Sequence, residues 1–250
     1  FSFILSLYGV IAYGSLVELW GVNNSFTLRH YVEFRKTVWP VIWYTIQLSA
    51  ASAVPAMMLG GLIAYLVTRH RFWGRSYLEM GSLLSFATPG TVMGLAYILA
   101  FNDGTLLLTS TSAIIVIALV FRNMPVAIRA SMSGLAQIDR SLEEASATLK
   151  AGSGTTMVRV LAPLLIYPLL AGLIFAFVSA MTAVSQIIFL VSAGKNLATV
   201  LLLARVERGD LGVAAAMATM LILMLLALIV MLLMASRYLD ARNRGKGLSI

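Results

Sequence analysis

Long apolar runs separated by short basic segments are the feature that most constrains how this sequence can fold. Of its 250 residues, 60% are hydrophobic and 11% are charged, whereas a soluble domain has about 25% charged residues. A packed soluble core does not need so much apolar surface, so the excess predicts an exterior that faces lipid. A helix needs about 20 mostly apolar residues to cross a bilayer. We therefore expect an all-α integral membrane protein.

Six apolar runs are long enough to be candidate transmembrane helices, and we place them in a single membrane domain that covers residues 1–250. The runs cover residues 2–20, 39–67, 78–101, 111–130, 164–190 and 212–236. The first run is too long and continuous for the apolar part of a signal peptide, so we interpret it as a span. The fourth is the weakest, because Arg122, Asn123 and Pro125 interrupt its apolar stretch.

The basic residues predict the orientation of these spans. They gather between the second and third runs, between the fourth and fifth runs, and in the tail. These residues are Arg69, Arg71, Arg75, Arg140, Lys150, Arg159, Arg237, Arg242, Arg244 and Lys246. The three segments alternate along the chain, so they share one side, and positive charge assigns that side to the cytoplasm. Segments 21–38 and 191–211 are also basic, but the bias still favours both termini in the cytoplasm.

The same composition argues against several other classes of protein. The basic residues form no block with interleaved aromatics, so nucleic-acid binding is not expected. The chain has no cysteine, and no H-E-x-x-H or G-x-S-x-G motif, which argues against an enzyme. No P-loop motif occurs, so the chain is not expected to bind a nucleotide, and no cofactor or metal site is expected in it.

The longest predicted cytoplasmic connection, residues 131–162, has a helical pattern of its own. Asp139 or Ser141 can cap a helix, and Ser141 with Glu144 fits an S-x-x-E capping box. Glu143 and Glu144 lie in the first turn, where the helix dipole favours negative charge.

An apolar stripe follows the cap, formed by Leu142, Ala145 and Leu149 at helical spacing. Gly152 and Gly154 are expected to end this helix, which we predict over residues 141–151. A second short helix should run from Thr155 or Thr156 towards Pro163. From the pattern alone, the first helix is either a surface helix on the bilayer or a docking helix for a cytoplasmic partner.

Residues 142–165, LEEASATLKAGSGTTMVRVLAPLL, resemble the EAA loop of binding-protein-dependent ABC importer permeases. Glu144, Ala145 and Ser146 match the Glu-Ala-Ala core of that loop, and Pro163 matches the proline before the next span.

Two positions depart from the family pattern. Lys150 stands where the family usually has a glycine, with Gly152 two residues later, and Ala162 replaces the usual leucine before the proline.

The resemblance implies a type I ABC importer permease fold with six transmembrane helices and a cytoplasmic coupling helix. It also implies a multi-pass location in the bacterial inner membrane and three kinds of partner. These are a dimer of ATP-binding cassette ATPases, which would bind ATP and Mg²⁺, a second permease half or subunit, and a periplasmic substrate-binding protein. The residues that it assigns to the ATPase contact are Ser141, Leu142, Glu143, Glu144, Ala145, Ser146, Leu149, Gly152 and Pro163.

Residues 44–75 and 89–102 are more narrowly similar to the ferric-iron permeases, and the chain resembles the C-terminal half of such a permease. Ferric iron is therefore the expected cargo. Permeases for polyamine, thiamine or phosphonate share the architecture and remain alternatives. An ion-coupled secondary transporter is a further alternative, which is disfavoured because the acidic residues lie at span ends or in loops.

Six residues inside the predicted spans are candidates for a translocation pathway. They are Pro89, Gly90, Arg122, Ser179, Thr182 and Gln186. Pro89 precedes a GxxxG pair, Gly90 and Gly94, which indicates close helix packing or a hinge beside a pathway. Arg122 falls near mid-depth, where a buried arginine usually faces the bundle interior or water. It either lines the path of an anionic or chelated cargo or has a structural role.

Ser179, Thr182 and Gln186 are predicted to share one face of the fifth span. They would form interhelical hydrogen bonds or a polar lining to the pathway. No cage of carboxylates, histidines or tyrosines is visible that would hold ferric iron within the membrane.

Overall fold

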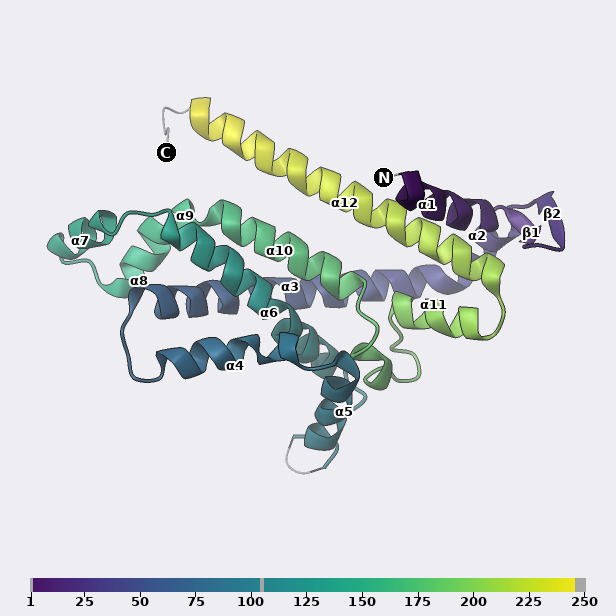
Figure 1. Ribbon diagram of the computed structural model, residues 1–250, viewed down its shortest axis with the longest axis horizontal. Coiled ribbons are helices and arrows are strands. Elements are labelled where there is room, and N and C mark those ends of the chain that lie inside the picture. Colours follow the sequence, from purple (N-terminus) through teal and green to yellow (C-terminus); the bar gives the residue numbers. More distant parts are fainter. Residues whose placement is uncertain (1, 104–105, 246–250) are drawn as a thin grey trace. The chain divides into compact units, whose positions relative to one another are not determined.

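The computed structural model describes residues 2–103 and 106–245, most of which are helical (Figure 1). The helices are α1 (Ser2–Gly14), α2 (Arg29–Glu33), η1 (Phe34–Val38), α3 (Trp39–Arg69), α4 (Arg75–Ala87), α5 (Gly90–Phe101), α6 (Ser112–Ala136), α7 (Ser141–Thr148), α8 (Ser153–Thr156), η2 (Met157–Leu161), α9 (Ala162–Leu164), α10 (Ile166–Met181), η3 (Ile187–Phe189), α11 (Ala198–Glu207) and α12 (Leu211–Gly245). Strands β1 (Val17–Leu19) and β2 (Asn23–Phe26) form an antiparallel hairpin. The predicted all-α class is confirmed, with this hairpin as a small addition.

Three of the described helical segments are long and apolar enough to cross a membrane: Arg29–Arg69, Ser112–Ala136 and Leu211–Met231. They confirm the predicted helices at 39–67, 111–130 and 212–236. Two bent helix pairs raise the number to as many as five if each pair is one span. The six-span topology therefore stays a prediction.

The first predicted span, residues 2–20, is wrong in its length. Helix α1 ends at Gly14, and the hairpin follows at once. A side chain at Gly14 would collide with the Trp20 ring, so the returning chain packs directly on the helix end. The hydroxyl of Ser15 donates to the carbonyl of Ala12 and lies 2.7 Å from the Tyr31 hydroxyl. These contacts fix a turn where the sequence shows only apolar continuity.

The third predicted span, residues 78–101, is not one straight helix. Helices α4 and α5 meet at an angle of 110°, as a broken span or a re-entrant loop. Thr88 is extended, with φ −100° and ψ 138°, between α4 and Pro89. Proline lacks an N–H and disfavours helical geometry in the residue before it, which explains the break.

The fifth predicted span, residues 164–190, is also too long. Helix α10 ends at Met181, and no helix covers residues 182–186. Both the hydroxyl and the backbone N–H of Thr182 donate to the carbonyl of Val178, which closes the last turn of the helix. At its start, α10 is bent by 77° from the segment Ser153–Leu164.

The chain divides into two compact units, of which residues 48–190 form unit 2. Its core joins α3, α6 and α10 through small residues. A side chain at Gly60 of α3 would lie 2.5 Å from the Ala127 side chain of α6, and one at Gly172 of α10 would lie 3.2 Å from the Ala127 backbone. Small residues let helix backbones approach closely in membranes, so Ala127 lies at the closest approach of three helices.

Unit 1 contains residues 1–47 and 191–250. In it, α1 and α2 pack against α12. Arg205 of α11 forms ion pairs with Glu33 (2.9 Å) and Asp210 (2.6 Å). The imidazole of His30 is buried, with Nε2 3.0 Å from the carbonyl of Val17. The two ion pairs of Arg205 connect α2 to the start of α12, and His30 connects α2 to β1.

Candidate functional site

The start of α7 is fixed by Asp139 rather than by a capping box on Ser141. Arg140 occupies the N-cap position and makes no side-chain cap. Oδ1 of Asp139 accepts the backbone N–H of Ser141 at 2.9 Å. Hydrogen bonds from the backbone and hydroxyl of Ser141 hold the pKa of Asp139 below its usual range. Asp139 therefore orders the turn that leads into the helix without being its N-cap, and the predicted S-x-x-E box on Ser141 is not formed.

Helix α7 ends earlier than predicted and without glycine. Its last residue is Thr148, and Lys150 then adopts a left-handed conformation with φ 58°. The N–H groups of Lys150 and Ala151 donate to the carbonyls of Ala147 (2.9 Å) and Ser146 (3.1 Å). This bond pair defines a Schellman motif, in which glycine is usual at the position of Lys150.

The predicted roles of Gly152 and Gly154 as the end of this helix are wrong. Gly152 is the N-cap of α8, in an extended conformation, and Gly154 lies within α8. The connection is also shorter than predicted, because residues 131–136 belong to α6.

We expect Lys150→Gly to stabilise the turn after α7. A left-handed conformation costs an L-residue about 1–2 kcal/mol and glycine very little. The amide of Ala151, which closes the turn, should exchange its hydrogen more slowly in the variant. The matched change Thr148→Gly, at the last residue of the helix, should weaken the final turn by up to about 1 kcal/mol and speed the same exchange. Slower exchange in both variants, or in neither, would contradict this account.

Arg69, the last residue of α3, lies against the start of the α7 segment. Its Nη2 donates to the carbonyl oxygens of Leu135 (3.0 Å) and Ile138 (2.8 Å). Its Nε lies 2.8 Å from Oε1 of Glu143, as an ion pair rather than an aligned hydrogen bond. The side chains of Arg69 and Glu143 are only 6% and 20% exposed. Glu143 therefore faces α3 rather than solvent.

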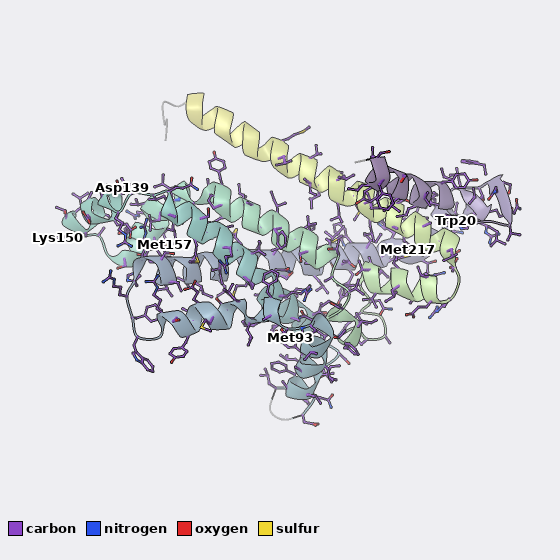
Figure 2. All side chains as sticks on the ribbon, in the orientation of Figure 1. Trp20, Met93, Asp139, Lys150, Met157 and Met217 are labelled. Carbon is purple, nitrogen blue, oxygen red and sulfur yellow. The ribbon has the colours of Figure 1, made fainter. Side chains whose placement is uncertain are left out.

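The other inward contact of α7 is a hydroxyl pair. Oγ of Ser146 lies 2.8 Å from Oγ1 of Thr156 in α8, and both side chains are buried. Figure 2 labels Asp139 and Lys150 near the two ends of α7, at one end of unit 2. Helix α7 is thus fixed to the rest of unit 2 by Glu143, which pairs with Arg69, and by Ser146, which contacts Thr156.

The remaining surface of α7 is open. Leu142 is 44% exposed and Leu149 is 83% exposed, and Glu144 and Ala145 are exposed as well. We call Leu142, Glu144, Ala145 and Leu149 the docking face. An apolar stripe with one carboxylate, left uncovered by the described residues, suits contact with another protein.

The predicted pathway residues Pro89, Gly90 and Gln186 are brought together. A side chain at Gly90 would collide with the hydroxyl of Ser185, and one at Gly94 would collide with the carbonyl oxygen of Gln186. The side chain of Gln186 is buried. The GxxxG pair therefore packs closely as predicted, but against the loop after α10 rather than against a helix.

The other predicted pathway residues lie apart from this contact. Ser179 is on α10, Thr182 follows its end and Gln186 lies in the loop, so the predicted common helical face is wrong. Arg122 is half-buried on α6, and no hydrogen bond or ion pair joins it to another residue in the described part of the chain.

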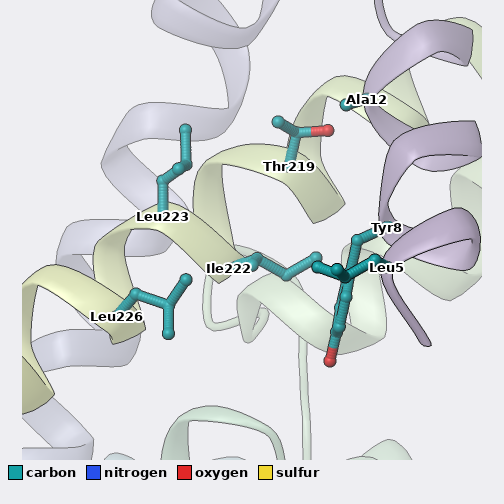
Figure 3. A pocket seen from close by; sticks show the side chains of 7 residues that line it. All are labelled: Leu5, Tyr8, Ala12, Thr219, Ile222, Leu223 and Leu226. Carbon is teal, nitrogen blue, oxygen red and sulfur yellow. The ribbon is translucent and has the colours of Figure 1, made fainter. Parts of the chain in front are cut away.

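A groove of about 340 Å³ lies between α1 and α12 in unit 1 (Figure 3). It is lined by Leu5, Tyr8, Ala12, Thr219, Ile222, Leu223 and Leu226. The hydroxyl of Thr219 already donates to the carbonyl of Ala215. The groove offers no charged group, so its lining suits hydrocarbon rather than an ion.

Known structures share this fold. The chain superposes on a bacterial ABC transporter involved in the import of the acidic polysaccharide alginate, with a TM-score of 0.78 over 94% of this chain and 90% of that chain at 12% identity. It superposes on the MetNI methionine ABC transporter with a TM-score of 0.61 over 81% of this chain and 94% of that chain at 16% identity. The fold is therefore that of an ABC importer permease.

Residues 56–245 match the family described as "Binding-protein-dependent transport system inner membrane component", and the chain belongs to this family. It is 43% identical over 224 residues to the ferric transport system permease protein FbpB of Actinobacillus pleuropneumoniae, over 88% of this chain and 33% of that protein. It is 30% identical over 191 residues to the probable sulfate transport system permease protein cysT of Chlorella vulgaris, over 71% of this chain and 72% of that protein.

A second ferric relative, the putative ferric transport system permease protein FbpB 1 of Haemophilus influenzae, is 44% identical over 196 residues, which is 76% of this chain and 31% of that protein. The chain thus spans about a third of the length of its ferric relatives. The family is one of transport components and not of enzymes.

Two residues of structural importance give little signal in the sequence. Arg69 counts there only as one of the basic residues that predict orientation, and its contact with Glu143 spans 74 positions. Of these two residues, Gly60 is easier to recognise from the sequence. A glycine inside a helical apolar run costs stability, so its presence usually has a packing reason.

Proposed function

We propose that this chain is a permease half that passes ferric iron, delivered by a periplasmic binding protein, into the cytoplasm. Membership of the transport family and the names of the ferric relatives support this proposal. In the complete importer, a second permease half would complete the membrane pathway and a dimer of separate ATPases would bind ATP and Mg²⁺. The chain would lie in a bacterial inner membrane, with both termini in the cytoplasm.

The docking face on α7 is the observation on which the coupling role rests. Its helix is fixed from within by Arg69 and Thr156, while Leu142, Ala145 and Leu149 stay uncovered. A rigid helix with an open apolar stripe can transmit a movement of a bound partner, whereas a loose loop would absorb it. We assign this face to the ATPase.

The test compares two identical changes on α7. Ala145 and Ala147 are both exposed, but they lie about 160° apart around the helix. Ala145→Glu places a charge on the docking face, where an unpaired buried charge should weaken ATPase association about tenfold or more. Ala147→Glu should leave association within about twofold, since an exposed surface change usually costs under 0.5 kcal/mol.

A pull-down of the ATPase by each purified permease variant measures the difference. Equal binding by Ala145→Glu and wild type would refute docking on this face. The alternative of an ion-coupled carrier would then be favoured if uptake also continued without ATP.

The cargo is tested with the complete importer in vesicles. Uptake of radioactive ferric iron, driven by internal ATP and added binding protein, should exceed uptake of a polyamine, thiamine, a phosphonate or sulfate. Preferred uptake of any of these four would overturn iron as the cargo but leave the permease role intact. Sulfate is included because a sulfate permease is among the relatives.

A further inference from the structure

Arg69 makes more contacts with the α7 segment than a residue that only marks orientation would need. Its two hydrogen bonds reach Leu135, in the last turn of α6, and Ile138, in the linker. The last carbonyls of a helix lack intrahelical partners and lie at the negative end of its dipole. A guanidinium there satisfies the helix end, and its remaining edge reaches Glu143 of α7.

We propose that Arg69 is a positioning residue that links α7 directly to α3, so that a movement of α7 reaches α3 as well as the helices next to it in the chain. This inference rests on the proposed docking of an ATPase on α7. The covalent connections of α7 lead only to α6 on one side and to α8 and α10 on the other. Contact with α3 requires a side chain, and Arg69 provides it.

The end of α3 is packed firmly enough to receive such a movement. Tyr65 and Ala64, one turn before Arg69, belong to a buried cluster that includes Met124, Ile128, Leu135, Leu161 and Leu165. Because Arg69 itself is 6% exposed, it has little freedom to swing away. A displacement of Glu143 would therefore pull on a residue held in the core of unit 2.

The chemistry of arginine suits this role. A guanidinium presents several N–H groups in a rigid plane, so it can hold two carbonyls and a carboxylate at once. Lysine would keep the charge but would bind these three groups less precisely. Arg69→Lys should therefore retain part of the link, and Arg69→Gln should lose it.

The first experiment uses the complete importer in vesicles and measures cargo transported per ATP hydrolysed. Arg69→Gln should lower this ratio at least about fivefold, the low end of usual coupling between sites. Arg69→Lys should retain part of the wild-type ratio. Binding of the ATPase in a pull-down should be unchanged, because the docking face is intact. An unchanged transport ratio in Arg69→Gln would overturn the inference.

A second variant guards against a folding defect. Glu143→Gln keeps the shape of the side chain and leaves the bonds from Arg69 to Leu135 and Ile138 in place. It should lower the transport ratio in the same direction with a normal yield of complex. If Glu143→Gln assembled normally and transported as wild type does, the link through this pair would be wrong.

A spectroscopic measurement separates the inference from the proposed function. The chain has no cysteine, so spin labels on Thr148→Cys and Arg71→Cys, both exposed positions, report the distance between α7 and the end of α3. The distribution should be narrow in the wild-type background and clearly broader with Arg69→Gln. Equal widths would refute the positioning role, whereas loss of ATPase docking alone would refute only the proposed function.

Discussion

A Gly60→Ala variant is expected to be less stable than the wild type by about 1–3 kcal/mol, the usual cost of overpacking a core. The added methyl group would lie 2.5 Å from the Ala127 side chain and 3.0 Å from the backbone nitrogen of Ile128. Neither obstacle can rotate away, because one is a Cβ and the other is backbone. Helices α3 and α6 would have to separate at the centre of unit 2.

The neighbouring glycine provides a matched control. A methyl group at Gly61 would lie 3.0 Å from Cδ2 of Leu169, the flexible end of a side chain, and 3.8 Å from Oγ of Ser131. Leu169 can adjust, and alanine favours a helix by about 0.5–1 kcal/mol over glycine. Gly61→Ala should therefore be neutral or stabilising. Thermal unfolding in detergent, followed by size-exclusion chromatography, compares the two; a Gly60→Ala variant as stable as Gly61→Ala would contradict the packing.

The sequence predicts the long helices of this fold better than their breaks. Pro55, Pro89 and Pro125 all lie in apolar runs, but only Pro89 interrupts a helix. Pro125 is buried in α6, where packing against neighbouring helices compensates for the lost hydrogen bond. That compensation depends on residues far away in the chain. A local pattern therefore cannot separate a kinked span from two helices.

The candidate coupling site likewise has some features that follow from the local sequence and others that do not. The position of α7 follows from Asp139, the acidic first turn and the apolar stripe, all of which are local. The end of α7 at Lys150 does not, because lysine is a poor predictor of a left-handed turn. The inward direction of Glu143 depends on Arg69, and adjacent glutamates give no sign of which one faces the protein.

Arg122 is expected to be required for transport rather than for assembly. It is the eleventh residue of α6, about 15 Å along a helix that must cross a hydrocarbon core about 30 Å thick. A charge at that depth is costly where it faces lipid. Since Arg122 is half-buried and has no partner among the described residues, we propose that its open side faces the pathway or the second permease half.

Arg122→Ala should lower uptake about tenfold or more, as expected for loss of a charged contact worth about 1.5–3 kcal/mol to a passing anionic or chelated cargo. Arg122→Lys keeps the positive charge and should retain most uptake. Arg129→Ala is the matched control, because Arg129 lies two turns further along the same face, closer to the end of α6, and is exposed, so its side chain can reach water. Uptake by the complete importer and the yield of assembled complex are measured for all three variants. If Arg122→Ala transported normally, or if it lost uptake only in proportion to lost complex, the residue would have a structural role at most.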